Sequence, residues 1–496
     1  MTKTSPLQPT ISSGVPGLDP ILAGGFTCNR LYLVEGVPGA GKTTLAMQFL
    51  REGVARGEKV LYVTLSETLD ELREMADSHG WSLDGIEIFE LLENNEHLDG
   101  DAPYTMFHPS EIELAETTQR VLDKVRATQP QRLVFDSLAE LRLLSGSALR
   151  YRRHVLSLKQ ALAGQKCTTL LLDHSGTDQQ GLEVHTIVHG VVHLASAASQ
   201  FGGDRHRLRV SKYRGRRIVG GYHDYRITTG GLRVFPRLIA SQFRRDRVKE
   251  TVSTGSAPLD ALLGGGIDRG TSTLLVGASG TGKSSLSILI AETAADRGER
   301  SAVFAFEESL ASLLTRADGL GMALEPYVAD GTVHVQAVDP AEFSPGEFAQ
   351  LVREAVEVRG SRVIVIDSLN GYLNAMPEEE HMMLQLHELL AYLASMDVLT
   401  VLVSAQLGLI GTMTSNVDVS YLADTVVLLR YFENAGEVNQ AISVLKKRTG
   451  SHERTIRPME LTSNGFVIGE PLRDFRGVLT GVPQERKPSA GDGTAS

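Results

Sequence analysis

Cysteine is almost absent from this 496-residue chain, which contains only Cys28 and Cys167. Two cysteines cannot build a disulfide framework or a four-cysteine zinc module, so neither is the basis of the fold. No apolar run approaches the roughly 20 residues that a membrane-spanning helix needs. The polar stretch Met1–Ser13 also lacks the apolar core of a signal peptide. We therefore expect a cytoplasmic protein in a reducing environment, without a membrane.

Positive charge is in deficit, because Asp and Glu outnumber Lys and Arg and give a net charge of −11 at pH 7. This balance argues against a protein that coats nucleic acid, although it is compatible with a local basic patch. A hydrophobic content of 42% and a charged content of 22% are ordinary for a globular protein. The length suits two domains of about 240 residues, each able to bury a core.

One stretch matches the phosphate-binding loop pattern G-x-x-x-x-G-K-[ST], and its residues are Gly277, Ala278, Ser279, Gly280, Thr281, Gly282, Lys283 and Ser284. The glycines let backbone N–H groups point inward at the phosphates of a nucleotide. Lys283 would reach the β and γ oxygens, and the Ser284 hydroxyl would ligate Mg²⁺. A short apolar run precedes the loop and helical periodicity follows it, which is the expected context. The stretch predicts a site for ATP and Mg²⁺.

A second complete match precedes it, with the residues Gly36, Val37, Pro38, Gly39, Ala40, Gly41, Lys42 and Thr43. The similarity extends beyond the loops, because Asp19 and Asp260, like Gly36 and Gly277, are 241 residues apart in matching contexts. An internal duplication explains this constant spacing. We expect one domain at 1–240 and another at 241–483, with a basic linker near 237–249 and a disordered tail at 484–496.

Apolar runs alternate with helical periodicity in both halves, which predicts an α/β fold with a mainly parallel sheet and helices on both faces. A polar stretch at 92–109 is expected to be a surface loop. The predicted strands lie at 59–65, 132–136 and 168–173 in the first half, and at 301–306, 362–367 and 399–404 in the second half. The clearest helices are predicted at 44–56 and 112–127.

Acidic residues of interest stand at the ends of four of these strands. Asp136 and Asp367 end buried strands in the Walker B arrangement, where the carboxylate holds Mg²⁺ through water or bonds the loop hydroxyl; a helix cap is the alternative. The predicted metal-binding residues are therefore Thr43, Asp136, Ser284 and Asp367. Glu67 ends another strand, and Glu307 and Glu308 end its counterpart, where Glu308 matches Glu67 and Glu307 matches Ser66. Such carboxylates polarise a water or a hydroxyl for attack on the γ-phosphate, or are merely solvated.

One basic cluster lies late in each half, and the residues of interest are Lys212 and Arg214 in the first half and Lys446 and Arg448 in the second. They have no obvious target in their own chain, so we expect them to act as arginine fingers on a neighbouring subunit. A solvated basic strand end is the alternative. His185, His189 and His193 are four residues apart, but a predicted strand at 190–194 interrupts the helix face that a shared metal would need.

The chain resembles the KaiC family of tandem RecA-type ATPases, from Ser12 to about Arg486. The resemblance rests on both phosphate-binding loops and on a set of shorter segments, which are Ser253–Gly255, Leu263–Gly266, Glu307–Ser309, Asp367–Leu369, Arg430–Glu433, Gly436–Glu437, Lys446–Arg448 with Gly450–His452, and Phe475–Pro483. It implies two tandem RecA-like ATPase domains, a homohexamer of two stacked rings with ATP between subunits, and protein signalling partners. Glu307 is then the expected general base, supported by Glu308.

The same resemblance implies that the first domain is chiefly an ATPase and the second a serine/threonine autokinase. Ser420 lies at the phosphoacceptor serine position, near the start of a strand, while Tyr421 replaces the family's threonine and Ser66 replaces its first glutamate. A hydroxyl at a strand start without a function is the alternative for Ser420. Two other functions stay open: a RecA-like or helicase-like DNA-dependent ATPase, which would need basic, aromatic pore loops, and a nucleotide-gated scaffold with little turnover.

Overall fold

The computed structural model describes residues 8–91, 109–174, 184–198, 202–243, 250–339, 341–374, 382–406, 420–434, 436–463, 465–480 and 484–485. The chain divides into two compact units, Met1–Arg237 and Leu238–Ser496. Almost all of the stretch predicted as a surface loop (92–108) lies outside the described residues, as does the tail after 485.

The first unit alternates strands and helices until its last four strands. Its elements are β1 (Thr10–Ile11), α1 (Leu18–Ile21), β2 (Phe26–Thr27), β3 (Leu31–Gly36), α2 (Lys42–Ala55), β4 (Val60–Thr64), α3 (Leu69–Ser78), β5 (Ile86–Glu90), α4 (Pro109–Thr128), β6 (Arg132–Asp136), α5 (Leu138–Ser145), α6 (Ala148–Gly164), β7 (Thr168–His174), β8 (Gly190–Ala197), β9 (Arg205–Tyr213), β10 (Tyr222–Thr228) and β11 (Gly231–Phe235).

The second unit repeats this order. Its elements are η1 (Ala240–Gln242), β12 (Thr251–Val252), α8 (Ala257–Leu262), β13 (Ile267–Asp268), β14 (Ser272–Gly277), α9 (Lys283–Asp296), β15 (Ser301–Ala305), α10 (Leu310–Gly319), α11 (Leu324–Ala329), β16 (Val333–Ala337), α12 (Pro345–Glu357), β17 (Val363–Asp367), α13 (Leu369–Asn374), α14 (Met382–Ser395), β18 (Leu399–Ala405), β19 (Thr425–Asn434), β20 (Glu437–Lys447), β21 (Arg457–Thr462), β22 (Gly465–Ile468), β23 (Phe475–Arg476), η2 (Val478–Thr480) and β24 (Gln484–Glu485).

Each unit is organised around a nine-stranded sheet. The first has the order β11-β10-β9-β8-β3-β7-β6-β4-β5, and the second has the matching order β22-β21-β20-β19-β14-β18-β17-β15-β16. The six strands from β8 to β5, and from β19 to β16, are parallel, and the last three of each sheet run antiparallel. The predicted fold class, tandem α/β domains with mainly parallel sheets, is confirmed.

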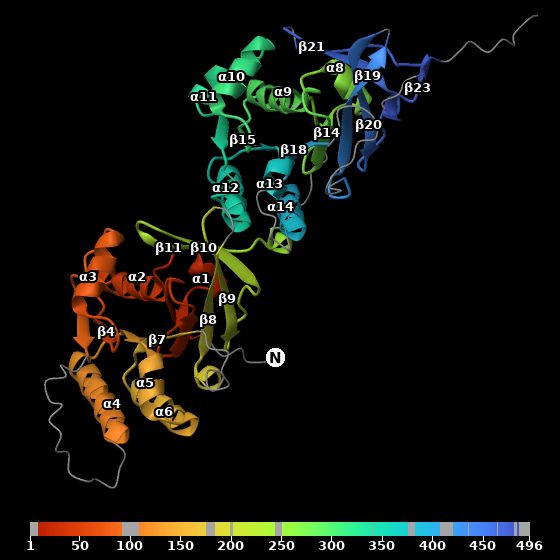
Figure 1. Ribbon diagram of the computed structural model, residues 1–496. Helices are drawn as coiled ribbons and strands as arrows, with labels where there is room; N and C mark the ends of the chain where they lie inside the picture. Colours follow the sequence, from red (N-terminus) through yellow and green to blue (C-terminus); the bar gives the residue numbers. More distant parts are fainter. Residues whose placement is uncertain are drawn as a thin grey trace, which may run out of the picture. The chain divides into compact units, whose positions relative to one another are not determined.

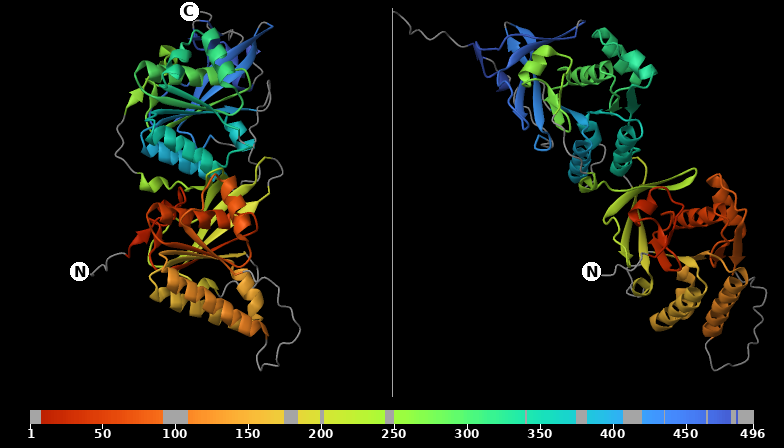
Figure 2. Two further views of the ribbon diagram at one scale, coloured as in Figure 1. Left: turned by 90° about the vertical axis from the view of Figure 1, so that its left-hand side faces the viewer. Right: turned by 180° about the vertical axis from the view of Figure 1, so that it is seen from behind.

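Helices cover both faces of each sheet (Figures 1 and 2). In the first unit, α2 and α3 pack their apolar residues on one face, and α4, α5 and α6 pack on the other. In the second unit, α9, α10 and α11 share one core, and α12, α13 and α14 share the opposite one. Parallel strands such as β6 and β17 are apolar on both faces because both faces are covered.

The segment predicted as a linker begins as part of the second unit. Leu238 is buried in the core beneath α14, and the Phe243 ring meets the Tyr392 ring edge-on with centroids 4.9 Å apart. The Ala240 N–H donates to the Glu388 carboxylate at 3.1 Å. Residues 244–249 lie outside the described part of the chain.

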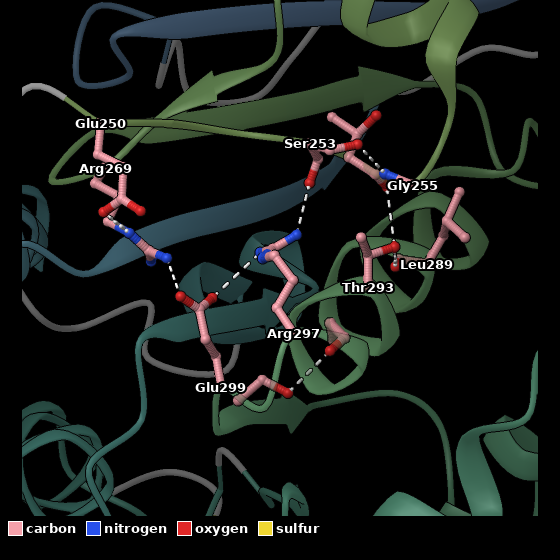
Figure 3. A network of polar contacts seen from close by, with 11 residues as sticks. Glu250, Ser253, Gly255, Arg269, Leu289, Thr293, Arg297 and Glu299 are labelled. Atoms are coloured by element: carbon pink, nitrogen blue, oxygen red, sulfur yellow. Dashed lines mark hydrogen bonds and ion pairs between the residues drawn. The ribbon is translucent and has the colours of Figure 1, made fainter.

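An ion-pair network ties the start of the second unit to the end of α9 (Figure 3). Glu299, just after α9, accepts hydrogen bonds from Arg269 and from Arg297, the latter at 3.2 Å. Arg269 also pairs with Glu250 at 2.6 Å, and Arg297 donates to the Ser253 carbonyl at 3.2 Å. The chain entering the domain is thereby fixed beside the helix that follows the phosphate-binding loop.

The first unit holds the matching carbonyl with a different arginine. Arg132, fully buried on β6, pairs with Glu58 and donates to the carbonyls of Ser12 and Phe49, each at 2.8 Å. Glu58 and Ser12 correspond to Glu299 and Ser253, but Arg132 has valine at its own counterpart, Val363. The entering chain is therefore held at matching carbonyls in both units, but by arginines at positions that do not correspond.

Glu58→Ala is expected to cost the first domain about 3 kcal/mol, because it leaves Arg132 buried without its counter-charge. Glu52→Ala is the matched control; its partner Arg56 is 54% exposed, so the loss of this surface ion pair should change the free energy of unfolding much less. The only tryptophan, Trp81, is buried in the first domain's core. Its fluorescence during urea unfolding therefore reports this domain alone. Equal, small losses in the free energy of unfolding in both variants would contradict the assignment of Glu58 as the counter-charge of Arg132.

Candidate functional site

Each phosphate-binding loop connects a central strand to the first turn of a helix. The loop of the first domain joins β3 to α2, and that of the second joins β14 to α9. Gly41 and Gly282 precede the helices with φ of 84° and 90°, a left-handed conformation that glycine adopts without strain. A Cβ at Gly282 would also meet a methyl group of Leu461 at 2.8 Å. The loops therefore open onto helix N-termini, whose free N–H groups attract anions.

The loop lysines fold back onto their own loops. Lys283 Nζ donates to the Ala278 carbonyl at 2.6 Å, and Lys42 Nζ donates to the carbonyls of Gly36 and Val37 at 2.9 and 3.1 Å. Burial lowers the pKa of Lys283 to about 8, with Asp367 and Glu307 opposing the shift. Burial also lowers the pKa of Lys42. A bound polyphosphate would provide the negative charges that pair with these two ammonium groups.

The Walker B aspartates lie beside the loop hydroxyls. Asp136 ends β6, and its Oδ2 accepts from Thr43 Oγ1 at 3.4 Å. Asp367 ends β17 and accepts a hydrogen bond from Ser284. Burial raises the pKa of both carboxyl groups. The four predicted metal-binding residues thus form two hydroxyl–carboxylate pairs, and hard oxygen donors of this kind suit Mg²⁺ bound together with nucleotide phosphates.

A cleft of about 650 Å³ extends from the second phosphate-binding loop. Its polar lining includes Lys283, Ser284, Glu307, Glu308, Arg316 and Asp367. Leu320, Val403 and Leu461 line it as well and form an apolar part of the wall. The fold thus gathers the loop lysine and hydroxyl, the Walker B aspartate and both glutamates of the second domain around one cavity.

The two glutamates of the second domain are held differently. Arg316 on α10 binds Glu308 with Nε and Nη2, at 3.2 and 2.6 Å, and also donates to Ser285 Oγ at 3.0 Å. Glu307 is exposed to the cleft and accepts from Ser368 Oγ at 2.8 Å. Glu308 is thus engaged by a cation, while Glu307 is positioned by a neutral donor.

Glu67 in the first domain lacks this arginine. It corresponds to Glu308, but Met75 stands where the second domain has Arg316. Among the described residues, no ion pair joins Glu67 to a basic side chain. Burial, followed by Asp136 and Glu71, raises the pKa of Glu67 to about 7. The first domain therefore presents a carboxyl group that gains and loses its proton near neutral pH.

Two further contacts at the first site were not predicted from the sequence. Tyr62, fully buried on β4, donates its hydroxyl to Asp136 Oδ2 at 2.6 Å, whereas the second domain has Val303 there. Asp173 at the end of β7 forms an ion pair with Arg142, and Ser404 is its counterpart. No sequence motif identifies Tyr62, or the Arg316 that binds Glu308 in the second domain. Both residues are noticeable only because the matching position in the other half holds a different residue.

The basic residues predicted to act in trans lie near the end of the sheet where its parallel strands begin, opposite the end that holds the phosphate-binding loops. Lys446 pairs in register with Val426 and donates to the carbonyls of Ser420 and Ala423 at 2.9 and 2.7 Å. Arg448 donates to the Tyr421 carbonyl at 2.8 Å. The expectation that these residues have no target in their own chain is therefore wrong. Ser420 lies in a turn, and the strand starts only at Thr425.

The first domain repeats this arrangement. Lys212 pairs with Val191 and binds the His185 carbonyl, while Arg214 donates to the Thr186 carbonyl at 2.8 Å. The register is interrupted after Val191 and after Val426, so Lys212 corresponds to Lys446. Ser420 of the second domain has His185 as its counterpart.

The three spaced histidines make different contacts in the structure. The strand predicted to separate them is confirmed as β8, and His193 lies on it. His185 Nε2 lies 2.8 Å and His193 Nδ1 3.6 Å from the two oxygens of Glu35, and His189 packs against Tyr32 and Tyr213. Within the described ranges, no group of three or more His, Cys, Asp or Glu could hold a metal ion. No helix in the same ranges is long and apolar enough to cross a membrane.

Comparison with known proteins finds similarity over almost the whole chain. The family model described as "ATPase: KaiC" matches residues 11–239 and 252–473. The chain is 26% identical over 485 residues to "Circadian clock protein KaiC3" of Synechocystis sp., covering 95% of this chain and 94% of that protein. It is 27% identical over 482 residues to "Circadian clock oscillator protein KaiC" of Synechococcus elongatus, covering 95% and 91%.

Without nucleotide, Glu67→Gln is expected to stabilise the first domain at about pH 8 and to leave its stability unchanged near pH 4. The folded pKa of about 7 exceeds the ordinary value of 4.5. The ionised carboxylate is therefore disfavoured in the folded state, and the penalty grows as pH rises from the ordinary pKa to the folded one. Urea unfolding followed by Trp81 fluorescence across this pH range measures the difference.

Glu308→Gln provides the contrast, because it removes the carboxylate that pairs with Arg316. It should destabilise the second domain at neutral pH, measured as faster amide hydrogen exchange in α10. Parallel pH profiles for the wild-type protein and Glu67→Gln would show that the Glu67 environment has been misread.

Proposed function

Since the chain belongs to the KaiC family of ATPases, we propose that it forms a homohexamer with Mg-ATP bound between neighbouring copies, and that its second domain transfers phosphate to Ser420 of the adjacent copy. Lys42 and Lys283 would hold the phosphates with the backbone of their loops. Thr43 with Asp136, and Ser284 with Asp367, would hold Mg²⁺. The magnesium ion would neutralise charge that develops on the phosphate oxygens.

One observation carries this proposal: the predicted acceptor and the basic residues lie at the edge of the sheet opposite their own phosphate-binding loop. Parallel strands begin at one edge of each sheet, here called the amino edge, and end at the carboxyl edge. Lys446 is paired with Val426, which lies beside Leu274, whereas the loop starts at Gly277. Three strand residues span about 10 Å, and the Lys446 side chain turns further away, toward Ser420 and Ala423.

This separation makes transfer within one chain implausible on geometric grounds. In-line phosphoryl transfer needs the attacking oxygen close to contact distance from the γ-phosphorus. Ser420 precedes even the start of β19, at the amino edge, while Lys283 and Asp367 lie at the carboxyl edge. A neighbouring copy that presents its amino edge would bring Ser420, Lys446 and Arg448 together to the phosphates.

The reaction then needs only groups that this chain provides. Ser420 Oγ attacks the γ-phosphorus, the bond to the bridging oxygen of ADP breaks, and the hydroxyl proton passes to Glu307 of the copy that holds the nucleotide. Glu307 is suited to this role because only Ser368 Oγ donates to it among the described contacts. Glu308 is bound by Arg316 and would support the site electrostatically. Lys446 and Arg448 would stabilise the transferring phosphoryl group.

In the first domain, Glu67 would activate water rather than a side-chain hydroxyl, which gives ATP hydrolysis. Lys212 and Arg214 would act on the neighbouring nucleotide as their counterparts do. His185 stands where the second domain has Ser420, so this domain offers a different group at the acceptor position. Two relatives are named circadian clock proteins. By that likeness, the ring would act as an ATP-driven regulatory or signalling hub for protein partners.

Incubation with Mg-ATP is expected to place phosphate on Ser420, with little on Tyr421. The Tyr421 hydroxyl lies beyond a rigid ring that is 55% exposed, so a site shaped for serine would misplace it. Phosphopeptide mapping with labelled ATP measures both positions. Ser420→Ala should lose most of the label, and Tyr421→Phe should keep it.

The ATPase rate of Ser420→Ala serves as the control for intact nucleotide binding. Label on Tyr421 alone, or an unmodified chain after long incubation, would refute the autokinase part of the proposal while leaving the ATPase in place.

A further inference from the structure

We propose that the first domain carries a second phosphate-binding site, at a small cavity on the amino edge of its sheet, distinct from its phosphate-binding loop. The cavity has a volume of about 250 Å³, and Arg30, Lys159, His189 and Arg214 line it. These residues come from the segment before β3, from α6, from the segment before β8 and from the residue that follows β9. The fold thus brings three cations together from distant parts of the sequence.

The three cations are not neutralised by carboxylates in the described part of the chain. Arg30 donates to the Asn29 carbonyl at 3.2 Å, Lys159 to the Ile187 carbonyl at 2.6 Å, and Arg214 to the Thr186 carbonyl at 2.8 Å. Each contact satisfies one donor of a group that has several. Burial, Arg214 and Arg30 lower the pKa of Lys159, which shows the mutual repulsion within the cluster.

His189 lines the same cavity without adding a charge. Burial, with Arg30 as the next cause, lowers its pKa to about 4, so the ring is uncharged at neutral pH. Its Nε2 is buried and has no hydrogen-bond partner among the described residues. A neutral imidazole carries one N–H, and a hydrogen bond with the Arg214 backbone, which opposes the lowering of the His189 pKa, engages the ring.

The second domain serves as an internal control, because three of the four matching positions there hold no basic side chain. Thr271 corresponds to Arg30, Leu390 to Lys159 and Asp424 to His189, while Arg448 keeps the place of Arg214. Arg448 lies 3.6 Å from Asp424, so its charge is balanced locally. The two sheets have the same register at these points. The positive cavity is therefore specific to the first domain and is not a requirement of the fold.

The cluster matches a phosphate group better than a single carboxylate. Two guanidinium groups and one ammonium offer fork-shaped and point-like donors to a dianion with several oxygens. The phosphate has two possible sources: inorganic phosphate, such as the product of ATP hydrolysis, or the polyphosphate of a nucleotide held by an adjacent copy. The second source rests on the proposed assembly, and the first does not.

The test compares the full-length wild-type protein with Arg30→Thr/Lys159→Leu, which installs the residues of the second domain. Both phosphate-binding loops stay intact, and excess Mg-ADP fills them before inorganic phosphate is titrated in a calorimeter. The variant should bind phosphate at least about 10-fold more weakly at this site, since two charge-assisted contacts are lost. Arg120→Thr/Arg153→Leu removes the same charges from exposed positions of α4 and α6 and should bind as the wild type does.

The second arm measures the ATP concentration at which rings assemble, by native mass spectrometry. If the phosphate belongs to a neighbouring nucleotide, the wild type gives no signal with inorganic phosphate, and the double variant needs at least about 10-fold more ATP to assemble. Arg30→Lys/Lys159→Arg keeps both positive charges, so it should behave as the wild type does in both measurements. If the double variant does not fold, as judged by Trp81 fluorescence, Arg30→Thr and Lys159→Gln are tested singly. Wild-type behaviour of the variants in both arms would overturn the proposal.

Discussion

Separation of charge across each mainly parallel sheet is the constraint on which the rest of the molecule depends. The carboxyl edge collects the phosphate-binding loop, the Walker B aspartate and the glutamates, because strands β3 and β6, and β14 and β17, all end there. The amino edge collects Lys212 and Arg214, or Lys446 and Arg448. Anion-binding groups thus occupy two edges that one copy cannot bring together. In the proposed assembly, a second copy would close a site between them.

The duplicated halves share this plan but differ in how their carboxylates are held. Arg316 binds Glu308 in the second domain, whereas Met75 leaves Glu67 with a raised pKa. Tyr62 donates to the Walker B aspartate of the first domain only. The same divergence reaches the amino edge, where Asp424 balances Arg448 in one half and the cluster around Arg30 is unbalanced in the other. The two domains therefore share the order of their sheets but differ in charge balance.

The fold and the loop-centred parts of the site could be predicted because their signals are contiguous. The sequences from Gly36 to Thr43 and from Gly277 to Ser284 are local, and burial of strands such as β6 and β17 on both faces leaves clear apolar runs. Arg316, Tyr62 and the Arg30 cavity could not be predicted in this way, since each acquires its meaning from residues distant in sequence. The turn at Ser420 was also missed, because the apolar run that begins at Val426 says nothing about the residues preceding it.

Exchange of phosphate between copies is the central claim, and complementation tests it most directly. Lys283→Ala removes the lysine that would hold the nucleotide's phosphates but keeps the acceptor, and Ser420→Ala keeps the lysine but removes the acceptor. Each variant alone should incorporate almost no label from Mg-ATP. Co-assembled rings of the two should carry label on Ser420 of the Lys283→Ala chain, identified by mass. Absence of label in the mixed rings, while wild-type rings are labelled on Ser420, would contradict transfer between copies.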